Sequence, residues 1–280
     1  MGQRMPIKQE ILSILYATKC RTMHIYDYRY TTHYLEIRQG LKLAYYDEGE
    51  GPETLLFLHG LGSYIRGYEK LIGLLRSEYR CIAIDLPNYG KSSQGDYPIN
   101  MAWFVKVIDQ FVQKLGIQRF SLGGHSMGGQ IAIHYALRHP ERLRQLLLFS
   151  PAGFETFSIL EQHYFKGIYN PLILKSLSTE QIRTNFHLNF HEFPEDAQFM
   201  IDDRLLLRKT PAYDHFCKMI PQCVFAMLDA PVFDRLPELQ MPTLVLYGLS
   251  DQLIPNSILH PKLETKTVAY QGFKQLKKGQ

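Results

Sequence analysis

The pentapeptide Gly124-His125-Ser126-Met127-Gly128 contains the residue types and spacing that point most directly to chemistry. Its G-x-S-x-G pattern is typical of a serine on a sharp turn between a strand and a helix, with the helix N-terminus behind the hydroxyl. The flanks fit this arrangement, since a short strand-like run precedes it (119–122) and a helical pattern follows it (129–137). Glycines suit such a turn because its backbone is strained and neighbouring chains lie close together. The pattern therefore predicts that Ser126 is a nucleophile.

Alternating strands and helices surround this turn and must position it. We expect strands at 34–37, 41–47, 54–58, 81–84, 119–122, 143–149 and 242–248, with helical spacing at 68–75, 104–115 and 129–137. The first two strands read as a hairpin, and the continuous apolar runs that follow are typical of strands covered on both faces. The alternation predicts an α/β fold with a mostly parallel, doubly wound sheet whose ligands bind at the carboxyl ends of its strands.

Residues 155–237 interrupt the alternation. They contain no clean strand pattern, many aromatic residues and several helix-like stretches. We interpret them as a helical cap inserted after the sixth strand. The predicted organisation is an N-terminal extension (1–31), a first part of the core (32–154), the cap (155–237) and a second part of the core (238–280).

Four motifs in order, each at a strand end, resemble those of the α/β-hydrolase superfamily over residues 32–273. The first is His59-Gly60-Leu61-Gly62. The second, residues 85–92, is similar to a D-x-P-G-x-G-x-S element with Asn88 in place of a glycine, and asparagine tolerates a positive φ better than most residues. The pentapeptide is the third motif, and residues 248–255 resemble the loop that carries the catalytic acid.

The resemblance implies a role for each of these positions. Ser126 attacks a carbonyl to give an acyl-enzyme, and the backbone N–H groups of Leu61 and Met127 form the oxyanion hole. Asp251 orients a histidine base, and residues 155–237 shape the pocket. The implied function is that of a serine hydrolase acting on an ester or related carbonyl substrate, without cofactor or metal. Lactone, C–C bond, amide and perhydrolase chemistry stay open.

The general base is the one part of this machinery that the sequence does not supply clearly. The resemblance places the base about 25–35 residues beyond the acid, on a loop after an eighth strand. His260 is the only histidine after Asp251, and it would reach Ser126 only by an unusual fold-back. Because residues 267–278 read as a helix, we expect the chain to be truncated just before its base, and to be a weak, marginally stable hydrolase.

Parts of the sequence also suggest two other functions. One is a catalytically impaired α/β-hydrolase-like protein without the base, acting as a binder or being a decayed gene product. The other is a nucleotide hydrolase, suggested by Gly90-Lys91-Ser92. A phosphate-binding loop needs a glycine five residues before Gly90, where Asp85 stands, so this function is disfavoured.

Composition limits the partners. With a net charge of +4 and scattered basic residues, the 280-residue chain is expected to bind a small-molecule substrate and no nucleic acid. No apolar run reaches the roughly 20 residues that span a bilayer. The four cysteines form no C-x-x-C pair, which favours a reduced, cytoplasmic location over secretion. The oligomeric state stays open.

Overall fold

A computed structural model describes residues 26–279 of the protein, and its centre is one seven-stranded sheet in the order β1-β2-β4-β3-β5-β6-β7. The strands are β1 (His33–Arg38), β2 (Leu41–Glu48), β3 (Thr54–Leu58), β4 (Arg80–Ile84), β5 (Phe120–His125), β6 (Leu143–Phe149) and β7 (Thr243–Leu246). β2 pairs antiparallel with β1 and β4, and all other neighbours are parallel. The predicted mostly parallel α/β sheet is confirmed.

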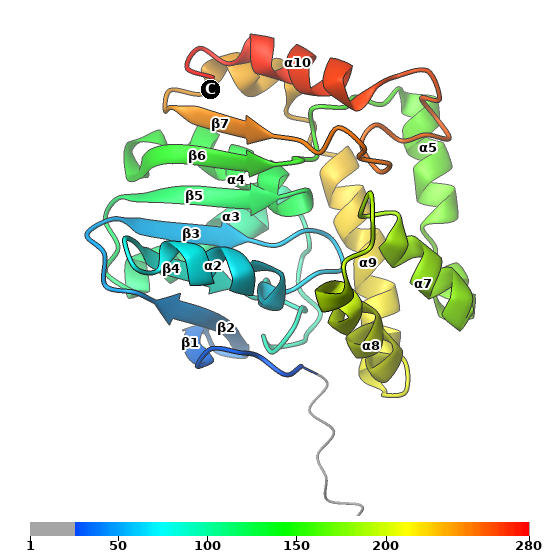
Figure 1. Cartoon of the computed structure of the whole chain (residues 1–280), viewed down its shortest axis with the longest axis horizontal. Helices are drawn as coiled ribbons and strands as arrows, with labels where there is room; N and C mark the ends of the chain where they lie inside the picture. Colours follow the sequence, from blue (N-terminus) through cyan, green and yellow to red (C-terminus); the bar gives the residue numbers. More distant parts are fainter. Residues whose placement is uncertain (1–25, 280) are drawn as a thin grey trace, which may run out of the picture.

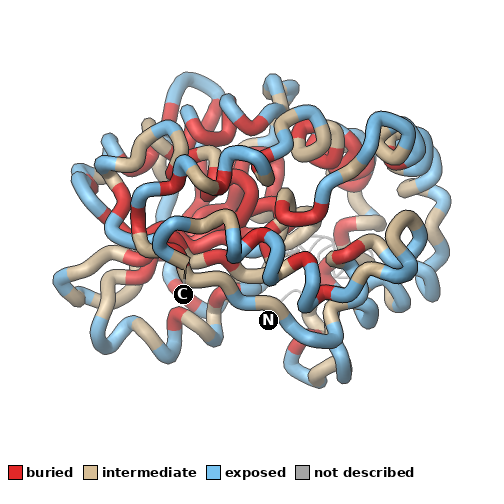
Figure 2. The backbone as a smooth tube through the Cα atoms, turned by 90° about the horizontal axis from the view of Figure 1, so that it is seen from above, coloured by how far each residue is buried: buried red, intermediate tan, exposed pale blue. Residues whose placement is uncertain are grey.

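Helices cover both faces of the sheet, with α2 (Glu69–Leu75) on one face and α3 (Met101–Lys114) and α4 (Met127–Arg138) on the other (Figure 1). Alternate side chains of β3 show why its sequence is apolar throughout. Leu55 and Phe57 pack into the cluster on the α2 side, whereas Leu56 and Leu58 pack into the larger cluster on the α3 and α4 side. Buried residues accordingly gather along the strands in the middle of the molecule (Figure 2).

The segment between β6 and β7 is helical, as predicted, and stands at the carboxyl ends of the parallel strands (Figure 1). We call residues 155–237 the helical insertion. It contains α5 (Ile159–Ile168), α6 (Pro171–Ser176), α7 (Thr179–His187), α8 (Gln198–Leu207) and α9 (Ala212–Leu228). The side chains of Ser158, Asn170 and Ser178 accept a backbone N–H in the first turns of α5, α6 and α7, which fixes where these helices begin.

Polar contacts join the helical insertion to the sheet layer. The amide of Gln130 in α4 donates to the carbonyls of Met227 and Ala230, both at 2.9 Å. On the other side, Asp203 in α8 accepts from the hydroxyl of Tyr64 and pairs with Arg66 at 3.4 Å. These contacts hold the helical insertion over the strand ends.

The C-terminal helix α10 (Thr265–Gln275) ends earlier than the expected 267–278. Leu276 adopts an extended backbone, and the chain then pairs with the start of β7, where Thr243 N donates to Lys278 O at 3.0 Å. Gly279 forms a parallel bridge to Thr243. A helix cannot make these sheet contacts, which explains the earlier end.

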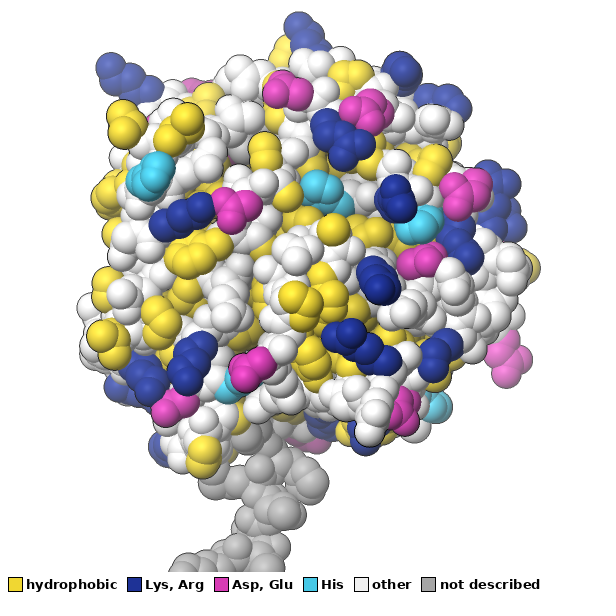
Figure 3. Space-filling model, turned by 180° about the vertical axis from the view of Figure 1, so that it is seen from behind, with side chains coloured by type: hydrophobic (Ala, Val, Ile, Leu, Met, Phe, Trp, Pro, Cys, Tyr) yellow, Lys and Arg dark blue, Asp and Glu magenta, His cyan; other side chains and the backbone are white. Residues whose placement is uncertain are grey.

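Other expectations concern the chain ends and the surface. Residues 1–25 of the predicted N-terminal extension, Cys20 among them, lie outside the described residues, while Cys81, Cys217 and Cys223 are free and buried. Within residues 26–279 we find no helix with the length and apolar character needed to cross a membrane. Acidic and basic side chains are interspersed on the face shown in Figure 3.

Candidate active site

Ser126 lies between the end of β5 and the start of α4, with φ 50° and ψ −117°. This left-handed value is disfavoured for a residue with a Cβ, so the backbone is strained there. Three hydrogen bonds hold the strained peptide in place. Ser126 N donates to Phe149 O at 3.0 Å, and Ser126 O accepts from the N–H groups of Gln130 and Ala152 at 3.1 and 3.0 Å.

The glycines around Ser126 are required by close backbone approaches. A Cβ on Gly124 would lie 2.3 Å from Gly128 O, and one on Gly128 would lie 2.2 Å from Leu58 O. Both distances are too short for any side chain, so β5, α4 and β3 can meet only through glycine. The elbow predicted from the pentapeptide therefore has the backbone geometry that its sequence indicates.

The loop after β3 lies against the elbow. A Cβ on Gly60 would lie 2.8 Å from His125 Nδ1 and 3.2 Å from Ser126 Cβ. The two predicted oxyanion donors are the N–H groups of Leu61, in this loop, and of Met127, at the first position of α4. Within residues 26–279, neither N–H donates to a protein acceptor. Both amides therefore remain able to bind an oxygen atom of a ligand.

A cavity of about 1650 Å³ opens above Ser126, between the strand ends and the helical insertion. Its wall includes Leu61 from the loop after β3 and Asp251 from the loop after β7. Most of the wall contributed by the helical insertion is apolar, including Phe165, Leu174, Ile182, Phe186, Phe199, Phe216 and Ile220. Pockets of this kind, with few polar groups among apolar walls, are typical of small-molecule sites.

Asp251, the predicted acid, is fixed by its own loop. Its Oδ1 accepts the N–H groups of Leu253 and Ile254 at 2.9 and 3.0 Å, which leaves Oδ2 without a partner among the described residues. Asp251 also acts on the elbow from a distance. Burial lowers the pKa of His125, and the charge of Asp251 raises it again in part. The acid loop therefore lies close enough to influence the residue next to Ser126.

The position of His125 in the cavity is a feature that the sequence pattern did not predict. The His125 side chain lies on the cavity wall beside Ser126, where it is exposed although the surrounding protein limits the hydration of its ring. The G-x-S-x-G pattern leaves its second position unspecified, so nothing in the motif indicates this placement. The close approach to Gly60 could be found only from the structure.

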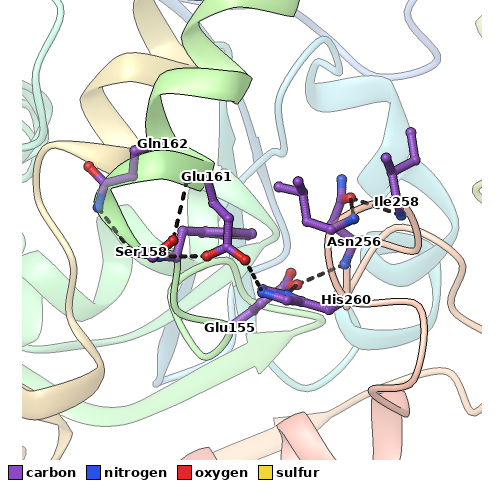
Figure 4. Close-up of polar contacts among 9 residues, drawn as sticks. Glu155, Ser158, Glu161, Gln162, Asn256, Ile258 and His260 are labelled. Carbon is purple, nitrogen blue, oxygen red and sulfur yellow. Dashed lines mark hydrogen bonds and ion pairs between the residues drawn. The ribbon is translucent and has the colours of Figure 1, made fainter.

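His260 lies between two carboxylates (Figure 4) and does not line the cavity of Ser126. Its Nδ1 contacts Glu155 Oε1, and its Nε2 is 3.1 Å from Glu161 Oε1 in α5. Burial alone would lower the pKa of His260, but the hydrogen bonds and charges of Glu155 and Glu161 outweigh that effect and raise it. Since both ring nitrogens are engaged, neither is left to accept a proton from Ser126. No histidine among residues 26–279 makes a hydrogen bond to Ser126 Oγ.

His59 and Asp85 are structural residues in neighbouring loops. Leu86 N donates to His59 Nε2 at 3.0 Å, so Nδ1 carries the proton and donates to Gly60 O at 2.9 Å. Burial lowers the pKa of His59 to about 4, which keeps it neutral. Asp85 accepts the N–H groups of Ile65 and Lys91, both at 2.8 Å, and the Tyr28 hydroxyl at 2.6 Å.

The second motif folds around Asp85 rather than around a phosphate. A Cβ on Gly90 would lie 2.1 Å from Asp85 Oδ2, and Asn88 adopts φ 72°, as its place in the motif predicts. Among residues 26–279, no group of three or more His, Cys, Asp or Glu side chains could hold a metal ion.

Comparison with known proteins identifies the family. A model of the α/β-hydrolase fold matches residues 53–272. The chain belongs to the α/β-hydrolase family. It is 29% identical to a 2-hydroxy-6-oxononadienedioate/2-hydroxy-6-oxononatrienedioate hydrolase of Paraburkholderia phymatum, over 80% of this chain and 81% of that protein. Its structure is similar to that of a probable hydrolytic enzyme from Pseudomonas aeruginosa PAO1, with a TM-score of 0.79, 25% identity, and coverage of 91% of this chain and 86% of that chain.

A third relative is longer. This α/β-hydrolase is 27% identical to the dihydrolipoyllysine-residue acetyltransferase component of an acetoin cleaving system from Cupriavidus necator, over 77% of the chain. The chain spans 56% of the length of that protein. The family and the two hydrolytic relatives named above indicate a hydrolase.

Proposed function

We propose that this α/β-hydrolase is a serine hydrolase of ester or related carbonyl substrates, with Ser126 as its nucleophile. The strained backbone of Ser126 at the floor of the large cavity is the observation that carries the proposal. Such strain persists only where the surroundings enforce it, and here glycines and three hydrogen bonds do so. In the proposed reaction Ser126 Oγ adds to the carbonyl carbon, and the leaving group departs to give an acyl-enzyme that water hydrolyses.

The N–H groups of Leu61 and Met127 would hold the oxygen on which negative charge develops, since each lacks a protein acceptor among the described residues. Asp251 would support a histidine base. Within residues 26–279, no histidine forms a hydrogen bond with Ser126 Oγ, so we expect slow turnover by this part of the chain. Loss of a triad member costs on the order of 10⁴-fold in kcat and leaves catalysis by the oxyanion hole and binding.

The test is covalent labelling of Ser126 with a fluorophosphonate, together with turnover of p-nitrophenyl butyrate. Labelling confined to Ser126, with slow turnover that Ser126→Ala abolishes, supports the proposal. Turnover that Ser126→Ala leaves intact would refute it.

The second candidate is a catalytically impaired protein that keeps the cavity for binding. The engagement of both His260 ring nitrogens by Glu155 and Glu161 favours it, because this histidine cannot then serve Ser126. Absence of labelling and turnover, with retained binding of small carbonyl compounds in the cavity, would select this candidate over the first.

A further inference from the structure

Arg204 in α8 is a cation on the wall of the same cavity as Ser126, and no carboxylate among residues 26–279 forms an ion pair with it. The other arginines on or near the cavity are paired. Arg66 lies 3.4 Å from Asp203, and Arg235 lies 2.9 Å from Glu238. Arg204 instead has a single hydrogen bond, from Nη2 to Gly62 O at 2.6 Å. Its charge is therefore left without an opposite charge in the described part of the chain.

The surroundings of the Arg204 guanidinium make this arrangement unusual. It lies over the ring of Phe216 at 4.0 Å and is 5.4 Å from the ring of Phe186. Burial among these groups lowers its pKa. A guanidinium has five N–H donors, and only one bond is formed. None of its nitrogens is both buried and unpartnered, so the remaining donors are accessible, and Arg204 lines both the cavity of Ser126 and a small pocket beside Tyr64 and Tyr89. A partly buried cation of this kind is costly unless an anion joins it.

We propose that Arg204 forms a subsite for a carboxylate group of the substrate. The proposal rests on the proposed function, because it places this group in the cavity that Ser126 opens into. The planar donor fork of arginine matches a carboxylate in two parallel hydrogen bonds. A doubly charged phosphate needs a second cation for its charge to be balanced. The other cavity arginine, Arg235, is already paired with Glu238. A singly charged carboxylate therefore fits best.

The carboxylates on the cavity wall determine the orientation in which the substrate binds. Asp251, Glu155 and Asp234 line the cavity and repel a second anion. A carboxylate would therefore bind at α8, and the reactive carbonyl would lie at Ser126. The rings of Phe186 and Phe216 beside Arg204 favour an apolar segment between the two groups. The substrate class is thus an ester or related carbonyl compound with a terminal carboxylate on an apolar chain.

The experiment compares two matched ligands, monomethyl adipate, which carries one carboxylate, and dimethyl adipate, which is neutral. Binding is measured by ligand-observed NMR titration on the full chain carrying Ser126→Ala, so that neither ligand is consumed. We expect the monoester to bind about tenfold more tightly or better. Adding Arg204→Gln should abolish this preference and leave the affinity for dimethyl adipate unchanged, because glutamine keeps a donor for Gly62 O.

Arg208→Gln is the matched control, since it also removes one positive charge from the end of α8 but Arg208 does not line the cavity. It should keep the preference. Equal affinities for the two ligands before Arg204 is changed would overturn the proposal. So would a preference that survives Arg204→Gln, or an equal loss of both affinities, which would mean that Arg204 only holds Gly62. If Arg204→Gln does not fold, Arg204→Lys keeps the charge without the fork and should reduce the preference several-fold.

This binding experiment does not use the Ser126 hydroxyl. A carboxylate preference with no fluorophosphonate labelling of the unsubstituted chain would therefore reject the proposed hydrolase and keep the subsite. Labelling of Ser126 without a carboxylate preference would keep the proposed hydrolase and reject the subsite.

Discussion

Replacing Ser126 by glycine should stabilise the protein while removing its nucleophile. The φ of 50° and ψ of −117° at this position are strained for any residue with a Cβ, at a cost of about 1–3 kcal/mol. Glycine removes that strain but loses about 0.5–1 kcal/mol through the greater freedom of its unfolded chain. Because Ser126 Oγ has no protein partner among the described residues, the loss of the hydroxyl itself costs little.

The informative comparison is between Ser126→Gly and Ser126→Ala, because alanine removes the hydroxyl and keeps the strain. We expect the glycine variant to be more stable by about 1 kcal/mol, which raises Tm by about 2 °C for a chain of this size. Differential scanning calorimetry and urea unfolding measure the difference. As a control, Ala269→Gly in α10 should destabilise by about 1 kcal/mol, since helical backbone gains nothing from glycine. If Ser126→Gly is no more stable than Ser126→Ala, the elbow is not strained and the reasoning fails.

Three further substitutions test the surroundings of the site. Gly128→Ala places a Cβ 2.2 Å from Leu58 O and should lower the free energy of unfolding, measured in urea, by about 3 kcal/mol. A near-neutral effect on stability would contradict the close approach of the two backbones. His260→Gln should reduce the free energy of unfolding at pH 6 more than at pH 9. A group whose pKa is raised on folding stabilises the folded state at pH values below its unfolded pKa. It loses that contribution as the pH rises through its folded pKa. A pH-independent loss would contradict its pairing with Glu155. Burial raises the pKa of Asp85 to about 6, so the free energy of unfolding should fall by about 2 kcal/mol between pH 4 and pH 6. Asp85→Asn should flatten that slope.

The parts of the fold that the sequence predicted well are those fixed by local patterns. A strand covered on both faces needs apolar residues throughout, and Leu55 to Leu58 show this without reference to the rest of the chain. The same holds for Asn88, whose place in a glycine-like position predicted the positive φ that the structure has. Backbone demands of this kind leave few residue types to choose from, so the sequence identifies them.

Side-chain neighbours far apart in sequence could not be predicted in this way. Arg204 and Gly62 are separated by 142 positions, and His260 and Glu155 by 105. No periodicity or spacing relates such pairs, because they meet only after the helical insertion has packed over the strand ends. The same limit explains His125, whose position in the pentapeptide tolerates many residues and whose contact with Gly60 depends on a different strand.

Local backbone requirements and long-range side-chain contacts control different properties of the candidate site. The former position the reacting groups, and the latter determine the selectivity for substrate. The nucleophile and its proposed oxyanion donors depend on backbone held by the sheet, by α4 and by glycines that nothing else can replace. The cavity walls depend on side chains of the helical insertion, which joins the sheet layer through polar contacts such as those of Asp203 and Gln130 and through buried residues of α9 in the large core cluster. Substitutions in the helical insertion can therefore change which substrate fits without disturbing the elbow. It follows that the sequence of such a chain indicates the type of reaction more readily than the substrate. Substitution of Arg204 is the experiment that tests substrate selectivity separately from the reaction at Ser126.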